Sequence, residues 1–454
     1  MQSTKVSWRS TVRGFNFEIF KTTNKYKVIY PDKTWNSFPI NAKKVLIQNF
    51  LYARTRPLIL TADHLLEYQT PKPFFKKMVD WGIKKDLSSI ELYNNLPASS
   101  LRKKFKANFK TVFLSPENKE IKTLPIGKKP NPEKVLLALS FGKDSLLSYA
   151  LLKDLGIDYD LCFCREMENF QKNDNQLKNS LLNSFCRKFN EKIIVYYDNV
   201  DEIFNNSKAG NLLDEIDNTN VMMAYALELL PIANLQNCGL LAFGNERDFD
   251  HTFIKRGLKI YSSFDQSSYY NRILNKNLKK FTKDQMQVIS LVEPLYNLAE
   301  MKIILSRYQY LLPYITSCHL EEKGKGRWCH DCRVCCEMYL YVAAWNHQPE
   351  KLGIKVNMFQ TKFKEYYAIL AENITNPSLM PRVIRDQQLL AFLMAYRNGF
   401  TGPLIDLFKK KHLAEAVKRK KALRKQFLSV GPMVNLPPFI AKPLKRLLEK
   451  ELSV

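Results

Sequence analysis

The sequence lacks any long hydrophobic run. No window approaches the roughly 18 apolar residues that a membrane-spanning helix needs. The opening stretch, MQSTKVSWRSTVRGFNF, contains no apolar segment of signal-peptide length. Internal repeats and low-complexity tracts are also absent. These absences argue against an integral membrane protein and against a repeat array, and they lead us to expect a globular, cytoplasmic protein.

Acidic residues are too few to balance the basic ones. The chain has 70 Lys+Arg against 44 Asp+Glu, which gives a net charge of +26. This excess favours polyanionic partners such as nucleic acid, nucleotides or an acidic membrane, although a solvated lysine-rich surface would give the same count. The nine cysteines fit a reducing compartment, as free thiols or metal ligands. The length of 454 residues suggests two or three domains.

Residues 1–130 are predicted to form a mixed α+β domain. Apolar and polar residues alternate, with aromatics, at 5–20 and 26–35, which predicts short strands. The apolar spacing at 41–58 and 73–87 predicts helices. The polar, Pro- and Lys-rich stretch 115–134 predicts a linker to the next domain.

From Val135 onward, apolar strands alternate with helices. We expect the strands at 135–140, 160–166, 191–199 and 239–246 and the helices at 145–156, 175–190 and 220–238. This alternation is typical of an α/β fold in which a parallel sheet carries helices on both faces. Such sheets bind ligands beyond the carboxyl ends of their strands. We expect this domain to span 131–345 and a helical, basic region to span 346–454.

The first of these strands runs into the turn SFGKDS. Gly142 permits close approach of the backbone to an oxyanion, the following helix start offers unpaired N–H groups, and Ser140, Ser145 and Lys143 add donors. The turn is not a Walker loop, because Asp144 follows the lysine. A carboxylate beside phosphate becomes favourable when Mg²⁺ lies between them. The pattern therefore predicts a Mg²⁺-pyrophosphate site, and the alternative is an ordinary helix start with an N-terminal charge.

This turn resembles the S-G-G-x-D-S signature of the PP-loop, or N-type, ATP pyrophosphatases, which cleave ATP between the α and β phosphates and transfer AMP to an acceptor. Phe141 stands where the signature usually has glycine. The resemblance implies an adenine nucleotide alpha hydrolase-like fold, with Lys143 and Asp144 acting in catalysis. The residues that it assigns to ATP are Ser140, Phe141, Gly142, Lys143, Asp144 and Ser145.

A second motif is a cluster of cysteines. Cys329, Cys332 and Cys335 form C-x2-C-x2-C, and Cys318 lies eleven positions earlier. Four thiolates at this spacing suit a tetrahedral structural Zn²⁺. An Fe–S cluster is a rival occupant, although the usual C-x3-C-P continuation is absent. Neighbouring residues of a type that can replace a ligand are His319, His330 and Cys336.

The order of the two motifs, a PP-loop and then T-S-C with C-x2-C-x2-C, is similar to that of 7-cyano-7-deazaguanine synthases. Those enzymes activate 7-carboxy-7-deazaguanine with ATP, convert it to the nitrile with ammonia, and carry a structural zinc held by four cysteines. The similarity covers roughly Val135 to Glu337. It implies that the zinc ligands in this chain are Cys318, Cys329, Cys332 and Cys335.

A third polar stretch comes at the end of the strand expected at 239–246. Asn245, Glu246, Arg247 and Asp248 are expected on the ligand side of the sheet. Glu246 suits Mg²⁺ or a substrate amine, and Arg247 suits bidentate binding of a carboxylate; a solvated loop with an internal ion pair is the alternative. With Gln266 and Ser267, the stretch resembles the GNE … QxS pattern of muropeptide glutamate epimerases, PP-loop relatives that also activate a carboxylate with ATP.

These features lead us to expect an ATP-dependent, carboxylate-activating ligase that uses ATP, Mg²⁺ and Zn²⁺. Its acyl-adenylate would react with ammonia or an amine, and a deazapurine is the leading candidate substrate. Two alternatives stay open: a PP-loop tRNA-modifying enzyme, and a zinc-stabilised module that binds a nucleotide or nucleic acid. The basic run 408–427 is a candidate surface for a polyanionic or protein partner. No membrane partner is expected, and a homodimer is one option for the assembly.

Overall fold

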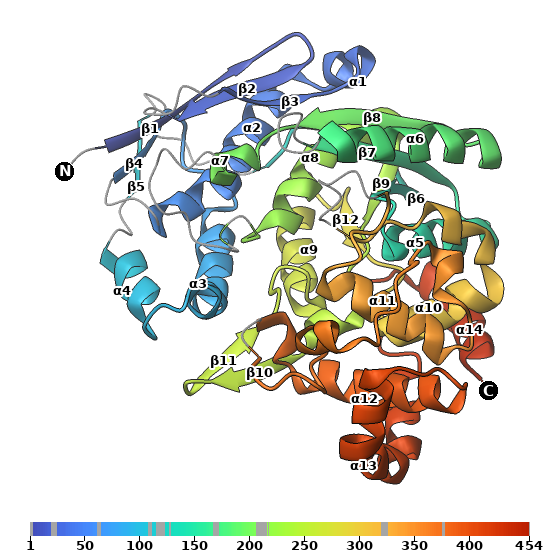
Figure 1. Ribbon diagram of the computed structural model, residues 1–454. Helices are drawn as coiled ribbons and strands as arrows, with labels where there is room; N and C mark the ends of the chain where they lie inside the picture. Colours follow the sequence, from blue (N-terminus) through green and yellow to red (C-terminus); the bar gives the residue numbers. More distant parts are fainter. Residues whose placement is uncertain are drawn as a thin grey trace.

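The computed structural model has an α/β architecture (Figure 1). It describes residues 3–19, 25–60, 65–107, 111–114, 123–126, 129–166, 172–205, 216, 218–318, 326–374 and 377–453. Ten strands form one mostly parallel sheet, in the order β12-β9-β6-β7-β8-β3-β2-β1-β4-β5, and helices flank it. The predicted α/β class, with helices on both faces of a parallel sheet, is confirmed at this level.

Five strands that pair in parallel form one half of the sheet, in the order β8-β7-β6-β9-β12. These strands are β6 (Asn131–Ala138), β7 (Tyr159–Glu166), β8 (Ile193–Asp198), β9 (Cys238–Ala242) and β12 (Gln287–Ile289). The helices between and after them are α5 (Lys143–Asp154), α6 (Lys172–Phe189), α7 (Glu202–Asn205), α8 (Val221–Gln236), α9 (Ser268–Thr282) and α10 (Asn297–Arg307).

The side chains of β6 divide the core into two layers. Val135 and Leu137 pack on one face of the sheet, with α5, α6 and α10, whereas Leu136 packs on the other face, with α8 and α9. Successive side chains of a strand point to opposite faces, so a strand that is covered on both sides must be apolar at every position. This explains the continuous apolar run that marked the strand in the sequence.

The N-terminal strands extend the same sheet. Strand β3 pairs antiparallel with β8, where Val28 lies opposite Asp198 and Ile29 opposite Tyr197. The N-terminal strands are β1 (Ser3–Ser10), β2 (Gly14–Ile19), β3 (Lys25–Ile29), β4 (Leu65–Tyr68) and β5 (Thr111–Phe113). The helices among them are α1 (Asp32–Ser37), α2 (Ile40–Thr55), α3 (Lys76–Tyr93) and α4 (Ser100–Ala107). The proposed boundaries at 130 and 345 therefore stay predictions, but one sheet runs through the first boundary.

Two local predictions were wrong. Residues 32–37 form helix α1, not the end of a strand, because Pro31 precedes them and Trp35 turns into the core beneath Tyr30. Strand β6 begins at Asn131, inside the predicted linker, because Asn131 pairs with Cys238 of β9. Residues 115–122 and 127–128 of that linker lie outside the described residues.

Helices make up most of the remaining chain. The segment after β9 forms a short 3-10 helix (Arg247–Asp250) and then a two-stranded hairpin, β10 (Thr252–Lys255) and β11 (Leu258–Tyr261). The C-terminal helices are α11 (Arg333–Ala344), α12 (Arg382–Arg397), α13 (Pro403–Phe427) and α14 (Pro438–Leu452). They pack against the α5 and α10 face of the sheet, at the lower right of Figure 1. Within the described residues, no helix is long and apolar enough to cross a membrane.

Candidate active site and metal centre

Strands β6 and β9 are neighbours in the sheet, and the turn after β6 and the loop after β9 lie side by side. Between these two strands, the connecting helices change from one face of the sheet to the other. The helix after β6 packs on one face, and the helix that leads into β9 packs on the other. In open α/β sheets, ligands bind at the carboxyl ends of the two strands on either side of such a switch point. Residues 140–145 and 244–247 occupy these two strand ends.

Phe141 replaces a glycine of the signature, yet its backbone adopts the conformation that favours glycine. Its φ is +62°, whereas Gly142 has an extended φ of −69°. The Phe141 ring is fully buried and packs against Phe163 and Phe185, with ring centroids 5.9 and 5.6 Å away. A left-handed residue other than glycine costs about 1–3 kcal/mol, and burying a phenylalanine side chain contributes about as much in return. The Phe141 ring therefore anchors the turn in the core, while Ser140 of the same turn stays exposed.

The centre of the site is a lysine surrounded by three carboxylates. Nζ of Lys143 donates to Oε2 of Glu246 at 3.2 Å, to Oε2 of Glu300 at 2.9 Å, and to Oδ1 of Asp144. One oxygen from each of Asp144, Glu246 and Glu300 lies within 4.8 Å of the others, a spacing that can hold a metal ion. Glu300 is completely buried, whereas the Asp144 side chain keeps 26% of its surface exposed.

Burial and charge oppose each other in this cluster. Burial raises the pKa of Glu246 and of Glu300 above the usual glutamate value, and the nearby Asp144 charge raises both further. Burial would lower the pKa of Lys143, but the three carboxylates together hold it above the usual value. The Lys143 ammonium in turn holds the pKa of Asp144 low, against the effect of burial. A single ammonium thus faces three acids, and this imbalance favours an added cation.

A buried hydrogen-bond chain fixes Glu246. Asn297, at the start of α10, donates from Nδ2 to Oε1 of Glu246 at 2.8 Å and to Oδ2 of Asp248 at 2.6 Å. Asp248 also accepts from Nε2 of Gln387, on α12, at 3.0 Å. Gln387 and Asp248 are both buried. The C-terminal helices therefore reach the site through these side chains and restrict the rotamer of Glu246.

Two buried polar atoms at the site lack a partner. Oε1 of Glu300 and Nδ2 of Asn245 make no hydrogen bond within the described residues. Leaving such atoms unsatisfied costs about 1–3 kcal/mol each.

Arg247 does not join the carboxylates: its guanidinium lies over the Tyr296 ring, 4.7 Å from the centroid, and forms no ion pair with a described residue. The site thus has a cluster of carboxylates and, apart from it, the guanidinium of Arg247.

Gly244 allows the two strand ends to approach this closely. A Cβ atom at this position would lie 2.6 Å from Cβ of Asp144, and no normal contact is that short. We expect Gly244→Ala to cost about 1–3 kcal/mol in the free energy of unfolding, because the loop or α5 must shift. Urea denaturation of this variant beside Gly142→Ala tests the steric effect. Gly142 has a negative φ of −69°, and an added Cβ there would meet Oγ of Ser140 at an ordinary 3.4 Å, so this control adds a methyl group without a close contact.

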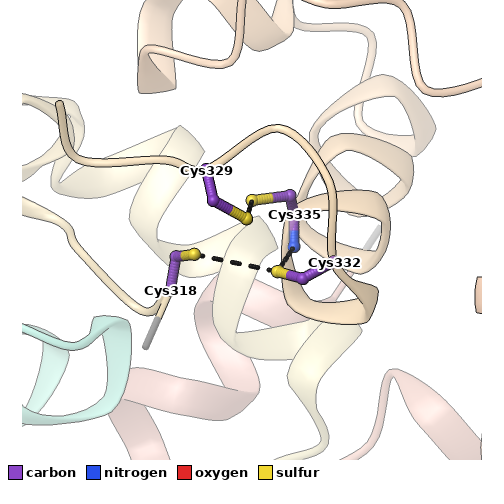
Figure 2. A group of neighbouring side chains, drawn as sticks. All are labelled: Cys318, Cys329, Cys332 and Cys335. Atoms are coloured by element: carbon purple, nitrogen blue, oxygen red, sulfur yellow. Dashed lines mark hydrogen bonds between the residues drawn. The ribbon is translucent and has the colours of Figure 1, made fainter. Parts of the chain in front are cut away.

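The predicted zinc ligands converge in space (Figure 2). Sγ of Cys318 lies 3.7 Å from Sγ of Cys332, and Sγ of Cys329 lies 3.7 Å from Sγ of Cys335. In a tetrahedral zinc centre with Zn–S bonds of about 2.3 Å, the sulfur atoms are about 3.8 Å apart. All four thiols lie within 4.8 Å of one another, so this group can hold a metal such as zinc.

The cluster is built on the start of α11. Cys332 caps this helix: its Sγ accepts the N–H of Cys335 at 3.5 Å, while Sγ of Cys329 accepts the N–H of Asp331 at 3.3 Å. Hydrogen bonds from Cys318 and Cys335 lower the pKa of the Cys332 thiol to about 4, and the thiolate is the form that binds metal. The neighbouring candidates point elsewhere or fall outside the described residues. Sγ of Cys336 contacts Sδ of Met358, Nε2 of His330 accepts the N–H of Lys355, and His319 is not described.

The cysteine cluster and the turn after β6 are physically joined. The residues just before Cys318 bond to the turn: the N–H of Thr316 donates to the carbonyl of Phe141 at 2.8 Å, and the N–H of Lys143 donates to Oγ of Ser317 at 3.3 Å. A metal that fixes Cys318 therefore also fixes the backbone that supports the turn.

The structure brings together only part of what the sequence singled out. Lys143, Asp144 and Glu246 meet in one cluster, and Asn245 is buried beside it, whereas Arg247 turns to Tyr296. The sequence offered no reason to select Glu300 or Asn297, whereas Asp248 belongs to the polar stretch that was expected at the end of the strand at 239–246. One signal was available: strand β12 ends just before Ser290, and α10, which begins at Asn297, starts at the same sheet edge.

Comparisons with known proteins provide no further assignment. No protein-family model matches the chain, and no curated protein matches it.

Proposed function

We propose that this protein is an ATP-dependent, carboxylate-activating enzyme of the PP-loop superfamily, similar to 7-cyano-7-deazaguanine synthase, with an adenine nucleotide alpha hydrolase-like sheet. One observation carries the proposal. A turn with the S-x-G-x-D-S pattern opens a helix at the switch point of the sheet, and its Lys143 and Asp144 meet Glu246 and Glu300 there. The four-cysteine cluster, bonded to the same turn, adds support.

Each part of the site has a role in this proposal. The N–H groups at the start of α5, the hydroxyls of Ser140 and Ser145, and the Lys143 ammonium bind the pyrophosphate portion of ATP. Asp144, Glu246 and Glu300 would hold Mg²⁺, which supplies charge neutralisation on the phosphates. The unpaired Arg247 guanidinium binds the substrate carboxylate.

The chemistry is then an in-line displacement. A substrate carboxylate oxygen attacks the α-phosphorus of ATP, a P–O bond to the β-phosphate breaks, and pyrophosphate leaves. Lys143 and the helix N-terminus stabilise the negative charge that develops on this leaving group. Ammonia or an amine next attacks the acyl carbon and releases AMP, which leaves an amide. A nitrile needs a second ATP: the oxygen of the primary amide attacks its α-phosphorus and pyrophosphate leaves. The C–O bond then breaks, so that AMP carries the oxygen away while the nitrogen loses its two protons. No covalent nucleophile of the protein is needed in this scheme.

Product analysis tests the proposal. The full chain is incubated with ATP, Mg²⁺, ammonium and 7-carboxy-7-deazaguanine, and pyrophosphate, AMP and the nitrile are followed by mass spectrometry. We expect Asp144→Asn to lower pyrophosphate release at least about a hundredfold, because one ligand charge at the reacting phosphates is lost. Asp406→Asn, the same change on the exposed side of α13, serves as the matched control and should leave the rate unchanged.

Other outcomes have clear meanings. Release of ADP and phosphate in place of AMP and pyrophosphate contradicts the proposed bond cleavage. A folded protein that binds ATP without turnover, with or without Asp144, is a binding module and not this enzyme. Turnover with another carboxylate, but not with the deazapurine, keeps the reaction class and rejects the substrate.

A further inference from the structure

One face of the N-terminal strands carries an organised set of cations. Strand alternation places Val6, Phe15, Phe17 and Val28 in the core, on the face that α2 covers. The intervening residues therefore point to the opposite side, which we call the outer face of β1, β2 and β3. On β7 and β8 the same side of the sheet packs against α6, and there Arg165 is exposed and Tyr197 is half-buried. In Figure 1, strands β1, β2 and β3 lie along the upper edge of the molecule, above α2.

The register aligns the outer side chains in two rows. In the first row, Arg9 lies opposite Asn16, and Asn16 lies opposite Lys27. In the second row, Ile29 lies opposite Tyr197, and Tyr197 lies opposite Arg165. Neighbouring strands are about 4.8 Å apart, so cations on alternate strands of one row are about 10 Å apart. This side of the sheet thus carries three spaced cations, Arg9, Lys27 and Arg165, and one tyrosine, Tyr197.

Three cations on this face have no acidic partner. Within the described residues, Arg9, Lys27 and Arg165 form no ion pair. The acids nearby are already engaged or lie at the far edge. Glu18 pairs with Lys25, Asp32 pairs with Arg13, and Glu67 lies opposite Lys5 in the register. Two of these cations, Lys27 and Arg165, lie beside Tyr197, and Arg9 lies two strands beyond Lys27.

A cavity of about 460 Å³ opens at the same place. Its volume lies within the range of about 300–1,000 Å³ that is usual for small-ligand sites. Nζ of Lys27 lies 5.1 Å from the centroid of the Tyr197 ring, and the buried Oδ1 of Asn179 has no hydrogen-bond partner in the described chain. The cavity walls include Tyr30, Pro31, Arg165, Asn179, Tyr196 and Tyr197. Flat apolar rings, a cation and an open amide oxygen are the groups that hold a nucleobase.

We infer that this outer face binds single-stranded nucleic acid, with phosphates on Arg9, Lys27 and Arg165 and one base stacked in the cavity beside Tyr197. The charge complements a polyanion, which fits the net charge of +26. The cavity selects a single strand over a duplex, because a paired base is stacked within its helix and cannot enter a pocket. This inference is independent of the ATP chemistry proposed above, since none of these residues contacts Lys143 or its carboxylates.

Fluorescence anisotropy tests this inference. The probe is a fluorescein-labelled oligouridylate of about 12 nucleotides, titrated with the full chain between about 50 and 200 mM salt. We expect the triple variant R9Q/K27Q/R165Q to bind at least about 30-fold more weakly and to lose about 2 from the slope of log K against log salt, since each single-strand phosphate contact contributes about 0.7. The basic run of α13, which the sequence also offered as a surface for a polyanion, is the competing site. The matched triple variant K410Q/K418Q/K421Q, on exposed positions of α13, should bind as the wild type does.

A second pair of variants tests the base. Tyr197→Ala should weaken binding about tenfold, whereas Tyr197→Phe, which keeps the ring, should not. Thermal denaturation of each variant shows whether the fold is intact. Equal affinity for a duplex of the same length overturns the inference. A loss confined to the α13 variant, or binding to phosphatidylserine vesicles but not to the oligonucleotide, also overturns it.

Discussion

Replacing Lys143 with methionine is expected to destabilise the fold by about 3–5 kcal/mol in the absence of divalent cations. The ammonium is the positive partner of three carboxylates at the site, and Glu300 is completely buried. Removing one member of a buried charge cluster leaves the others desolvated and mutually repelling. Urea denaturation in a chelator measures the loss, and Lys153→Met, on the exposed side of the same helix, should cost less than about 1 kcal/mol.

The same variant carries two internal checks. Millimolar Mg²⁺ or Mn²⁺ should restore much of the stability of Lys143→Met, because a cation bound by Asp144, Glu246 and Glu300 takes the place of the ammonium. Adding Glu300→Gln should recover part of the loss without metal. A Lys143→Met protein that is as stable as the wild type in chelator would show that these carboxylates are not clustered in solution.

The loss should also depend on pH in a defined direction. Burial raises the pKa of Glu246 and of Glu300 above the unfolded value, so the folded state holds more protons than the unfolded state between those two values. Stability then falls as the pH rises through that interval. Without Lys143 the pKa of each acid rises further, so the penalty should be larger at pH 8 than at pH 5.

Replacing Cys329 with serine is expected to remove one equivalent of zinc and to lower the free energy of unfolding by at least about 3 kcal/mol. The buried thiol is one of four that converge, and loss of a structural metal releases both the α11 start and the segment at Cys318. Metal analysis of the purified chain and thermal denaturation provide the two measurements.

Cys336→Ser is the control for the ligand assignment. This cysteine is adjacent in sequence and equally buried, but its sulfur faces Met358. We expect Cys336→Ser to keep its zinc. Zinc loss from this variant, with zinc retained in Cys329→Ser, would contradict the ligand set. The proposed function adds a further expectation: ATP affinity should also fall in Cys329→Ser, since Thr316 and Ser317 support the turn.

Local patterns in the chain predicted four of the five strands of the parallel half, all but β12, and the convergence of the cysteines. The apolar run at β6 was readable because a strand buried on both faces has no polar position. Cys329, Cys332 and Cys335 were readable because a loop and one helical turn bring residues three apart to one point. The helix at 32–37 was missed. Pro31 is a local signal for a helix start, but the packing of Trp35 against Tyr30 that completes the explanation is visible only in the structure.

The acidic site shows where local reasoning ends. Lys143 and Asp144 are adjacent in sequence, but Glu300 is 157 positions from Lys143 and reaches it from another helix. Asn297 donates a hydrogen bond to Glu246 and Gln387 donates one to Asp248, and no spacing in the sequence predicts either contact. These contacts depend on the order of the strands in the sheet, because that order determines which strand ends are neighbours.

By itself, the sequence determined the α/β alternation, the turn opened by Ser140 and the four-cysteine group, because each depends on residues within one or two elements. Only the tertiary structure decided that the N-terminal strands join the same sheet, that Glu300 completes the acidic cluster, and that Lys27 and Arg165 lie beside Tyr197 at the cavity. The physical reason is that these features arise from side chains on separate elements. Their free energies depend on burial and charge that exist only when those elements pack together.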